Sequence, residues 1–154
     1  MIHIYYGMGK GKTSSAVGAG MRACGAGKKV LLIQFLKDCN SSELKVLPFD
    51  IFKAPDNLPF NPDESYREWV DSALSYVKRS DADFIILDEF IDIIGDFITV
   101  SDAVKLIKSL SAEAVLTGHK NFDELTEIAD YVTYFEKIKH PYDKGVKARM
   151  GIEY

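Results

Sequence analysis

Residues 2–14 read Ile2-His3-Ile4-Tyr5-Tyr6-Gly7-Met8-Gly9-Lys10-Gly11-Lys12-Thr13-Ser14. The β-branched and aromatic run Ile2–Tyr6 predicts a buried strand, which stops at a glycine. A glycine-rich loop between a strand and a helix can aim backbone N–H groups and the positive helix N-terminus at phosphate oxygens. Lys12 adds a positive charge, and the hydroxyl of Thr13 is a ligand that Mg²⁺ accepts. We therefore predict that residues 7–14 bind phosphate; an ordinary glycine-rich turn is the alternative.

The loop is shorter than the common phosphate-binding motif. In the pattern G-x-x-x-x-G-K-[ST] the first glycine stands five residues before the second, which in this chain is position 6. That position is Tyr6 and the first glycine is Gly7, so the loop is one residue short. We expect a shorter loop to hold a phosphate chain at a different depth or in a different direction.

Short apolar runs alternate with helical patterns along the rest of the chain. Strands are expected at residues 30–35, 49–52, 84–87, 114–117 and 131–136, and helices at 13–26, 63–79, 101–110 and after Asn121. Asn61-Pro62 is typical of a helix start, and Asn121 with Glu124 has the spacing of a capping box. The alternation predicts an α/β fold with a mostly parallel sheet and helices on both faces, in one domain spanning residues 1–154.

Two carboxylates follow the apolar run at residues 84–87. Asp88 and Glu89 are expected at the carboxyl edge of the sheet, where nucleotides bind in α/β folds. A carboxylate at that edge can hold Mg²⁺ directly or through water. A solvated strand end is the alternative, and the loop at residues 7–14 favours the metal site.

Composition excludes several classes of protein. The chain has 154 residues, of which 47% are apolar and 27% charged, as in an ordinary globular domain. No apolar run approaches the length of a membrane span, and the N-terminus lacks the features of a signal peptide. Cys24 and Cys39 have neither metal-site nor disulfide-framework spacing. We expect a reduced, cytoplasmic protein without a membrane segment.

Charge is distributed unevenly. The net charge is +6 over residues 1–37, −13 over 38–136 and +3 over 137–154, which sum to −4. Nucleic-acid binding requires a clustered basic face, so the acidic middle argues against it. The basic ends suit a local polyanion site, and the glycine-punctuated tail at 137–154 is able to fold over an anionic ligand. A chance distribution and a solvated, frayed terminus are the alternatives.

Several segments together resemble the ATP:corrinoid adenosyltransferases. The matching stretches occur in order along almost the whole chain and are Gly7–Thr13, Arg22–Val30, Gln34–Lys37, Leu87–Glu89, Leu116–Gly118, Ala129–Asp130 and Lys139–Ile152. The last of them is far more specific than the loop. The resemblance implies a RecA-like P-loop fold, a homodimer, ATP and a cobalt(I) corrinoid as substrates, Mg²⁺, and a flavodoxin-like electron donor.

The implied reaction transfers the 5′-deoxyadenosyl group of ATP to cobalt and releases triphosphate, in adenosylcobalamin synthesis or salvage. In this family ATP lies in the shortened loop in the opposite direction to an ordinary NTPase, which agrees with the loop length. Lys12 and the loop residues Gly7, Met8, Gly9, Lys10, Gly11, Thr13 and Ser14 are implied to bind the triphosphate. Thr13, Asp88 and Glu89 are implied to hold Mg²⁺. No general base is required, since cobalt(I) is the nucleophile.

Some segments depart from the family pattern. The Gly-Phe-Thr-Trp segment near the corrinoid is replaced by residues 57–62, which keep only Phe60, and Thr-Gly-Arg is replaced by Thr117-Gly118-His119. The chain also begins almost at its first strand, where longer members have an N-terminal helix. We expect the γ-phosphate deepest at the first helix, and the adenosine toward a mouth formed by Phe60, His119 and His140. The alternatives are a P-loop phosphotransferase or ATPase that cleaves the β–γ bond, and a non-catalytic ATP- or corrinoid-binding relative.

Overall fold

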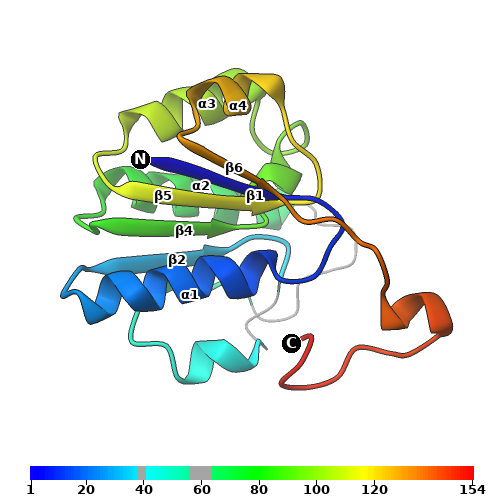
Figure 1. Cartoon of the computed structure of the whole chain (residues 1–154). Coiled ribbons are helices and arrows are strands. Elements are labelled where there is room, and N and C mark those ends of the chain that lie inside the picture. Colours follow the sequence, from blue (N-terminus) through cyan, green and yellow to red (C-terminus); the bar gives the residue numbers. More distant parts are fainter. Residues whose placement is uncertain (38–40, 56–63) are drawn as a thin grey trace.

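The structure is a computed structural model that describes residues 1–37, 41–55 and 64–154. Within these ranges the strands form one sheet in which every pairing is parallel, in the order β3-β2-β4-β5-β1-β6 (Figure 1). The strands are β1 (Ile2–Tyr6), β2 (Val30–Gln34), β3 (Asp50–Phe52), β4 (Phe84–Asp88), β5 (Glu113–Gly118) and β6 (Tyr131–Tyr134). The predicted parallel α/β fold is confirmed, and the arrangement is consistent with a P-loop NTPase-like fold.

Helices cover both faces of the sheet, as predicted. The helices are α1 (Lys12–Gly25), α2 (Glu64–Arg79), α3 (Val100–Ser109) and α4 (Asp123–Ile128), with short 3-10 turns η1 (Ser42–Lys45), η2 (Phe90–Ile93) and η3 (Pro141–Lys144). In the part of the chain that the structure describes, no helix has the length and apolar character needed to cross a membrane.

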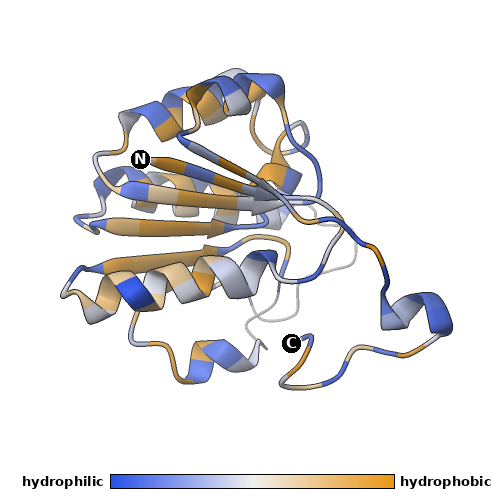
Figure 2. Cartoon of the chain, in the orientation of Figure 1, coloured by the Kyte–Doolittle hydropathy of each residue, from blue (hydrophilic) through white to orange (hydrophobic). Residues whose placement is uncertain are grey.

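Alternate side chains of the strands enter two separate cores. In β2, Leu31 and Ile33 pack with residues of α2 and α3, whereas Leu32 packs with α1 on the other face. This division follows from the period of two along a strand. Because both faces are covered, β2 and β4 are buried throughout, and Figure 2 shows both as almost continuously hydrophobic.

One predicted helix start is wrong. The N-cap of α4 is Phe122, whose side chain makes no capping bond. The side-chain amide of Asn121 instead donates to Thr126 Oγ1 at 2.7 Å, so the capping box expected from Asn121 and Glu124 does not form. The helix predicted at 101–110 begins one residue earlier, where the Thr99 side chain accepts from the Asp102 backbone N–H. Asn61-Pro62 and Phe60 lie outside the described residues.

The segment after β6 leaves the sheet and returns to the loop that follows β1. Figure 1 shows η3 projecting away from the sheet and the C-terminus lying back near the amino end of α1. Lys10 Nζ donates to Ile152 O at 2.5 Å, and Ser42 Oγ donates to Tyr154 O at 3.1 Å. The last residues of the tail are therefore held against the loop and against η1.

Candidate active site

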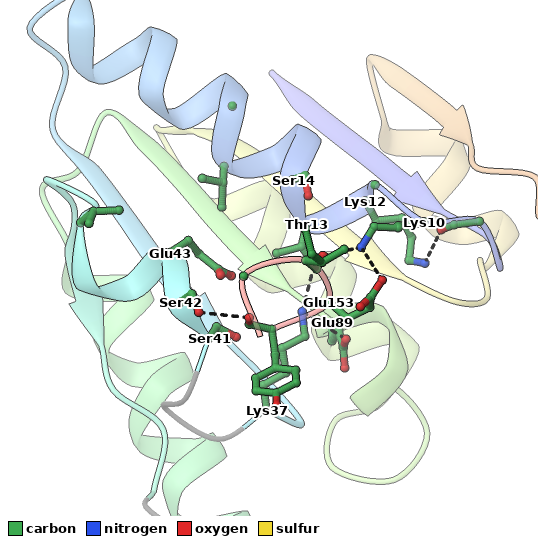
Figure 3. Close-up of a pocket in the computed structure, with 18 residues that line it drawn as sticks. Lys10, Lys12, Thr13, Ser14, Lys37, Ser41, Ser42, Glu43, Glu89 and Glu153 are labelled. Carbon is green, nitrogen blue, oxygen red and sulfur yellow. Dashed lines mark hydrogen bonds and ion pairs between the residues drawn. The ribbon is translucent and has the colours of Figure 1, made fainter. Parts of the chain in front are cut away.

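A pocket of about 610 Å³ opens at the carboxyl edge of the sheet (Figure 3). Its walls come from residues 9–14 and the next turn of α1, from Lys37 and Glu89, from residues 41–46 around η1, and from residues 151–154. The ends of β1, β2 and β4 deliver the loop, Lys37 and Glu89 to this edge, where α/β folds bind their ligands.

Two glycines of the loop pack against the chain that continues from β6. The N–H of Gly7 donates to Gly118 O at 3.1 Å, and that of Gly9 donates to Phe135 O at 2.7 Å. A Cβ would lie 2.4 Å from Phe135 O at Gly7 and 2.6 Å from Glu136 O at Gly9. Only glycine fits at these two positions, because another segment of backbone lies so close. The sequence predicts that the two N–H groups face a phosphate, but in the structure both donate to backbone carbonyls. The N–H groups at the start of α1 lack intrahelical partners and lie beside the pocket.

Gly9→Ala is expected to lower the free energy of unfolding by about 1–3 kcal/mol, because the new methyl group overlaps the backbone at residue 136. The control is Gly18→Ala, at an exposed helix position with open space, where alanine is expected to add about 0.5–1 kcal/mol. Urea unfolding measures both. Equal stabilities of the two variants would contradict the packing argument.

The side chain of Lys12 closes over its own loop. Its Nζ donates to Gly7 O at 2.7 Å and to Gly9 O at 3.1 Å. Partial burial lowers the pKa of Lys12, and the nearby carboxylates of Glu89 and Asp92 oppose that shift. The ammonium therefore lies at the pocket wall, and its two hydrogen bonds stabilise the conformation of the loop.

A buried carboxylate organises the floor of the site. The Asp88 side chain is fully buried. Its Oδ1 accepts from Thr13 Oγ1 at 2.9 Å and from Thr117 Oγ1 at 2.6 Å, and its Oδ2 accepts from Gln34 Nε2 at 3.2 Å. The partners come from α1, β5 and β2, so Asp88 joins the loop to the centre of the sheet.

Lys37 completes this cluster. Its Nζ lies 2.7 Å from Asp88 Oδ2, 3.3 Å from Glu89 Oε1 and 2.9 Å from Thr13 Oγ1. Burial opposes the charge on Lys37, but the two carboxylates outweigh it and raise its pKa. Burial also raises the pKa of Glu89, which Lys37 partly offsets.

The sequence pattern alone predicts no role for Lys37 or for Thr117. Thr117 Oγ1 accepts from the Glu89 backbone N–H at 2.8 Å, in addition to its bond to Asp88. The feature that points to Lys37 is its place in the chain. Lys37 follows β2 just as Glu89 follows β4, and these two strands are neighbours in the sheet. Only the strand order places their ends together.

His119 is paired with a carboxylate beside the site. Its backbone N–H donates to Asp92 Oδ1 at 2.9 Å, and its Nδ1 lies 2.8 Å from Asp92 Oδ2. The hydrogen bond to Asp92 raises the pKa of His119, and partial burial opposes the rise. Lys12 lowers this pKa and Glu89 raises it, and the imidazole is not among the described residues that line the pocket.

The remaining predicted site residues are spread along the rim and the tail. Ser14 and Lys10 line the pocket, whereas the exposed Met8 does not belong to the described lining. His140 caps η3 by accepting from the Tyr142 N–H, on the segment that projects from the sheet in Figure 1. Phe60 falls outside the described residues.

Asp92→Asn is expected to lower the pKa of His119, because the hydrogen-bonded carboxylate is what raises it. The pKa of His119 is higher in the folded chain than its value of about 6.5 in the unfolded chain. The ion pair with Asp92 therefore stabilises the fold fully below a pH of about 6.5, and this stabilisation is lost as the pH rises through the folded-state pKa of His119. The substitution should therefore destabilise the chain more at acidic than at alkaline pH. NMR titration of the imidazole and urea unfolding measure the two effects. Asp96→Asn, at an exposed carboxylate, is the control, and an unchanged His119 titration in Asp92→Asn would refute the pairing.

Comparisons with known proteins identify the family of the chain. The family model for ATP:corrinoid adenosyltransferase BtuR/CobO/CobP matches residues 1–154. The chain is 30% identical to a corrinoid adenosyltransferase of Escherichia coli strain K12, with 100% of this chain and 85% of the relative covered. It is 29% identical to the corrinoid adenosyltransferase CobA of Salmonella typhimurium, with 100% of this chain and 85% of that relative covered. The chain therefore belongs to the ATP:corrinoid adenosyltransferase family.

Proposed function

We propose that this chain transfers the 5′-deoxyadenosyl group of ATP to a cobalt(I) corrinoid and releases triphosphate, as a transferase of adenosylcobalamin synthesis or salvage. The observation that carries the proposal is the pocket at the end of β1. It combines the shortened loop, the start of α1 and a cluster of carboxylates, in a chain that matches the family from end to end.

The main requirement of the reaction is stabilisation of the leaving triphosphate. The Co–C5′ bond forms with both electrons supplied by cobalt, the C5′–O5′ bond breaks, and O5′ departs with its electron pair as part of the triphosphate. Lys12 and the N–H groups of Lys12–Ser14 would stabilise that developing charge. Since cobalt(I) is the nucleophile, the protein must supply positioning and electrostatic stabilisation and no general base.

The oxygens of Thr13, Asp88 and Glu89 fit the chemistry of Mg²⁺, which prefers carboxylate, hydroxyl and phosphate oxygens. Thr13 Oγ1 and Asp88 Oδ1 are 2.9 Å apart, and adjacent oxygens around Mg²⁺ are separated by about the same distance when each bond is about 2.0–2.1 Å. The cluster already holds a cation, the Lys37 ammonium. When bound, Mg²⁺ would neutralise part of the triphosphate charge.

Glu89→Gln is expected to raise the Mg²⁺ concentration for half-maximal activity by about tenfold, because a charged ligand is lost. The fold should persist, since Glu89 follows β4 and its amide replacement can still accept from Lys37. Activity across a Mg²⁺ titration measures the first effect, and the urea midpoint serves as the control. An unfolded variant would mean that the carboxylate has a structural role instead.

Incubation with ATP, Mg²⁺ and a chemically reduced corrinoid tests the proposed function. We expect the absorption spectrum of an alkyl–cobalt bond and triphosphate as the phosphorus product. Orthophosphate without alkyl–cobalt would support the β–γ phosphotransferase or ATPase. Tight ATP binding with no product would support a non-catalytic binding relative.

We further propose, from the family resemblance, that the active species is a homodimer and that a flavodoxin-like protein supplies the electrons for cobalt(I). Light scattering of the purified chain tests the first, and alkyl–cobalt formation with reduced flavodoxin as the sole reductant tests the second.

A further inference from the structure

The ammonium group of Lys37 lies among the oxygens to which the proposed function assigns the metal. Its Nζ is 2.7 Å from Asp88 Oδ2, 2.9 Å from Thr13 Oγ1 and 3.3 Å from Glu89 Oε1. Figure 3 shows Lys37, Thr13 and Glu89 pointing toward one another at one wall of the pocket. A cationic group of the chain itself therefore lies within this oxygen cluster.

Burial makes a cation at this place necessary. The side chain of Asp88 is 0% exposed and that of Glu89 is 20% exposed, so the two carboxylates are largely removed from water. Buried carboxylates require a compensating charge. Gln34 and Thr117 contribute hydrogen bonds without charge. Within residues 1–37, 41–55 and 64–154, the cation within ion-pair distance of these carboxylates is Lys37.

We propose that Lys37 is a positioning residue that holds the place of the metal in the nucleotide-free enzyme and gives it up when metal and triphosphate arrive together. The inference rests on the proposed function, since it takes Thr13, Asp88 and Glu89 as the metal ligands. Metal–oxygen bonds of about 2.0–2.1 Å bring a bound Mg²⁺ too close to the present position of the ammonium. Two cations so close together in a largely buried site repel strongly.

Replacement of the Lys37 ammonium by the metal requires an anion with which the displaced ammonium can pair. Lys37 ends in a flexible four-carbon stem, and its Nζ lies on the same pocket wall as the loop that binds the triphosphate. A triphosphate entering with the metal supplies that anion, so the carboxylates and the ammonium remain paired before and after the exchange. The metal alone should therefore bind weakly, and metal and nucleotide should bind with positive coupling.

Binding of Mn²⁺ without nucleotide tests this role, with free Mn²⁺ measured by electron paramagnetic resonance. Lys37→Met keeps the length of the side chain and removes its charge, and we expect it to bind Mn²⁺ about tenfold more tightly than wild type, or better. Lys29→Met is the matched control. It removes the same charge from an exposed lysine that pairs with Asp81 beyond the opposite end of β2, and its Mn²⁺ affinity should equal that of wild type. Equal affinities of Lys37→Met and wild type would overturn the proposal, and so would an equal gain in Lys29→Met.

Stability gives a second readout. Lys37→Met leaves Asp88 and Glu89 without a cation, so it should unfold at a lower urea concentration than wild type and recover when Mn²⁺ is added. If the variant is isolated unfolded, refolding on addition of Mn²⁺ supports the proposal, and failure to refold at saturating Mn²⁺ overturns it. Lys37→Arg keeps the charge and should keep the weak Mn²⁺ binding of wild type.

These measurements contain neither ATP nor corrinoid, which separates the two proposals. If wild type forms no alkyl–cobalt while Lys37→Met binds Mn²⁺ more tightly, the proposed function fails and the role of Lys37 stands. If wild type forms alkyl–cobalt and Lys37→Met gains no Mn²⁺ affinity, the role of Lys37 fails alone.

Discussion

Replacing Lys12 by alanine is expected to lower kcat for adenosyl transfer by about 10²–10³-fold, the usual cost of removing one group that stabilises charge in a transition state. The triphosphate is a poor leaving group unless its developing charge is compensated, and the Lys12 ammonium lies at the pocket wall. The substitution also removes the bonds that Nζ makes to Gly7 O and Gly9 O. Single-turnover formation of alkyl–cobalt measures the effect.

Two controls separate charge from loop shape. Lys12→Met keeps most of the side-chain volume and removes the charge, so it should be nearly as slow as Lys12→Ala. Lys10→Ala removes a lysine whose Nζ contacts the Ile152 carbonyl and Glu153, and its loss should be much smaller. Wild-type turnover in Lys12→Ala would remove Lys12 from the account of the reaction.

Asp88→Asn is expected to lower the free energy of unfolding by about 3–5 kcal/mol, as is typical when one partner of a buried ion pair is removed. Asp88 is fully buried and compensates the Lys37 ammonium, while Thr13 and Thr117 both donate to it. The amide supplies no charge, and its N–H₂ group meets donors. Urea unfolding measures the loss.

The matched control is Asp81→Asn, which removes an exposed carboxylate that pairs with Lys29. Exposed ion pairs contribute little, so the urea midpoint of this variant should stay near that of wild type. An equally mild effect in Asp88→Asn would mean that the buried cluster does not stabilise the fold.

The fold could be predicted because its signals are local. Continuous apolar runs such as residues 30–33 and 84–87 are what a strand covered on both faces requires, and the described strands begin within one residue of the predicted runs. Errors arose where local patterns compete. The Asn121 side chain bonds Thr126 instead of capping α4, and the N–H groups of Gly7 and Gly9 bond to backbone carbonyls of other segments.

The site could be predicted only where its residues share one segment. Lys12 and Thr13 follow from the loop, and Asp88 with Glu89 from the end of a strand. Lys37 and Thr117 lie 51 and 29 residues from Asp88 in the sequence. They meet it because β4 lies between β2 and β5 in the sheet, an order that the sequence pattern does not contain.

The central claim is that the enzyme breaks the C5′–O5′ bond of ATP, and the fate of O5′ tests it most directly. ATP carrying ¹⁸O at the 5′ bridging position would be incubated with Mg²⁺, reduced corrinoid and the wild-type chain, and the products analysed by mass spectrometry. The account predicts that the label leaves entirely in triphosphate, in amounts equal to the alkyl–cobalt formed. Label retained on ADP, with unlabelled orthophosphate released, would contradict it and assign the pocket to β–γ cleavage.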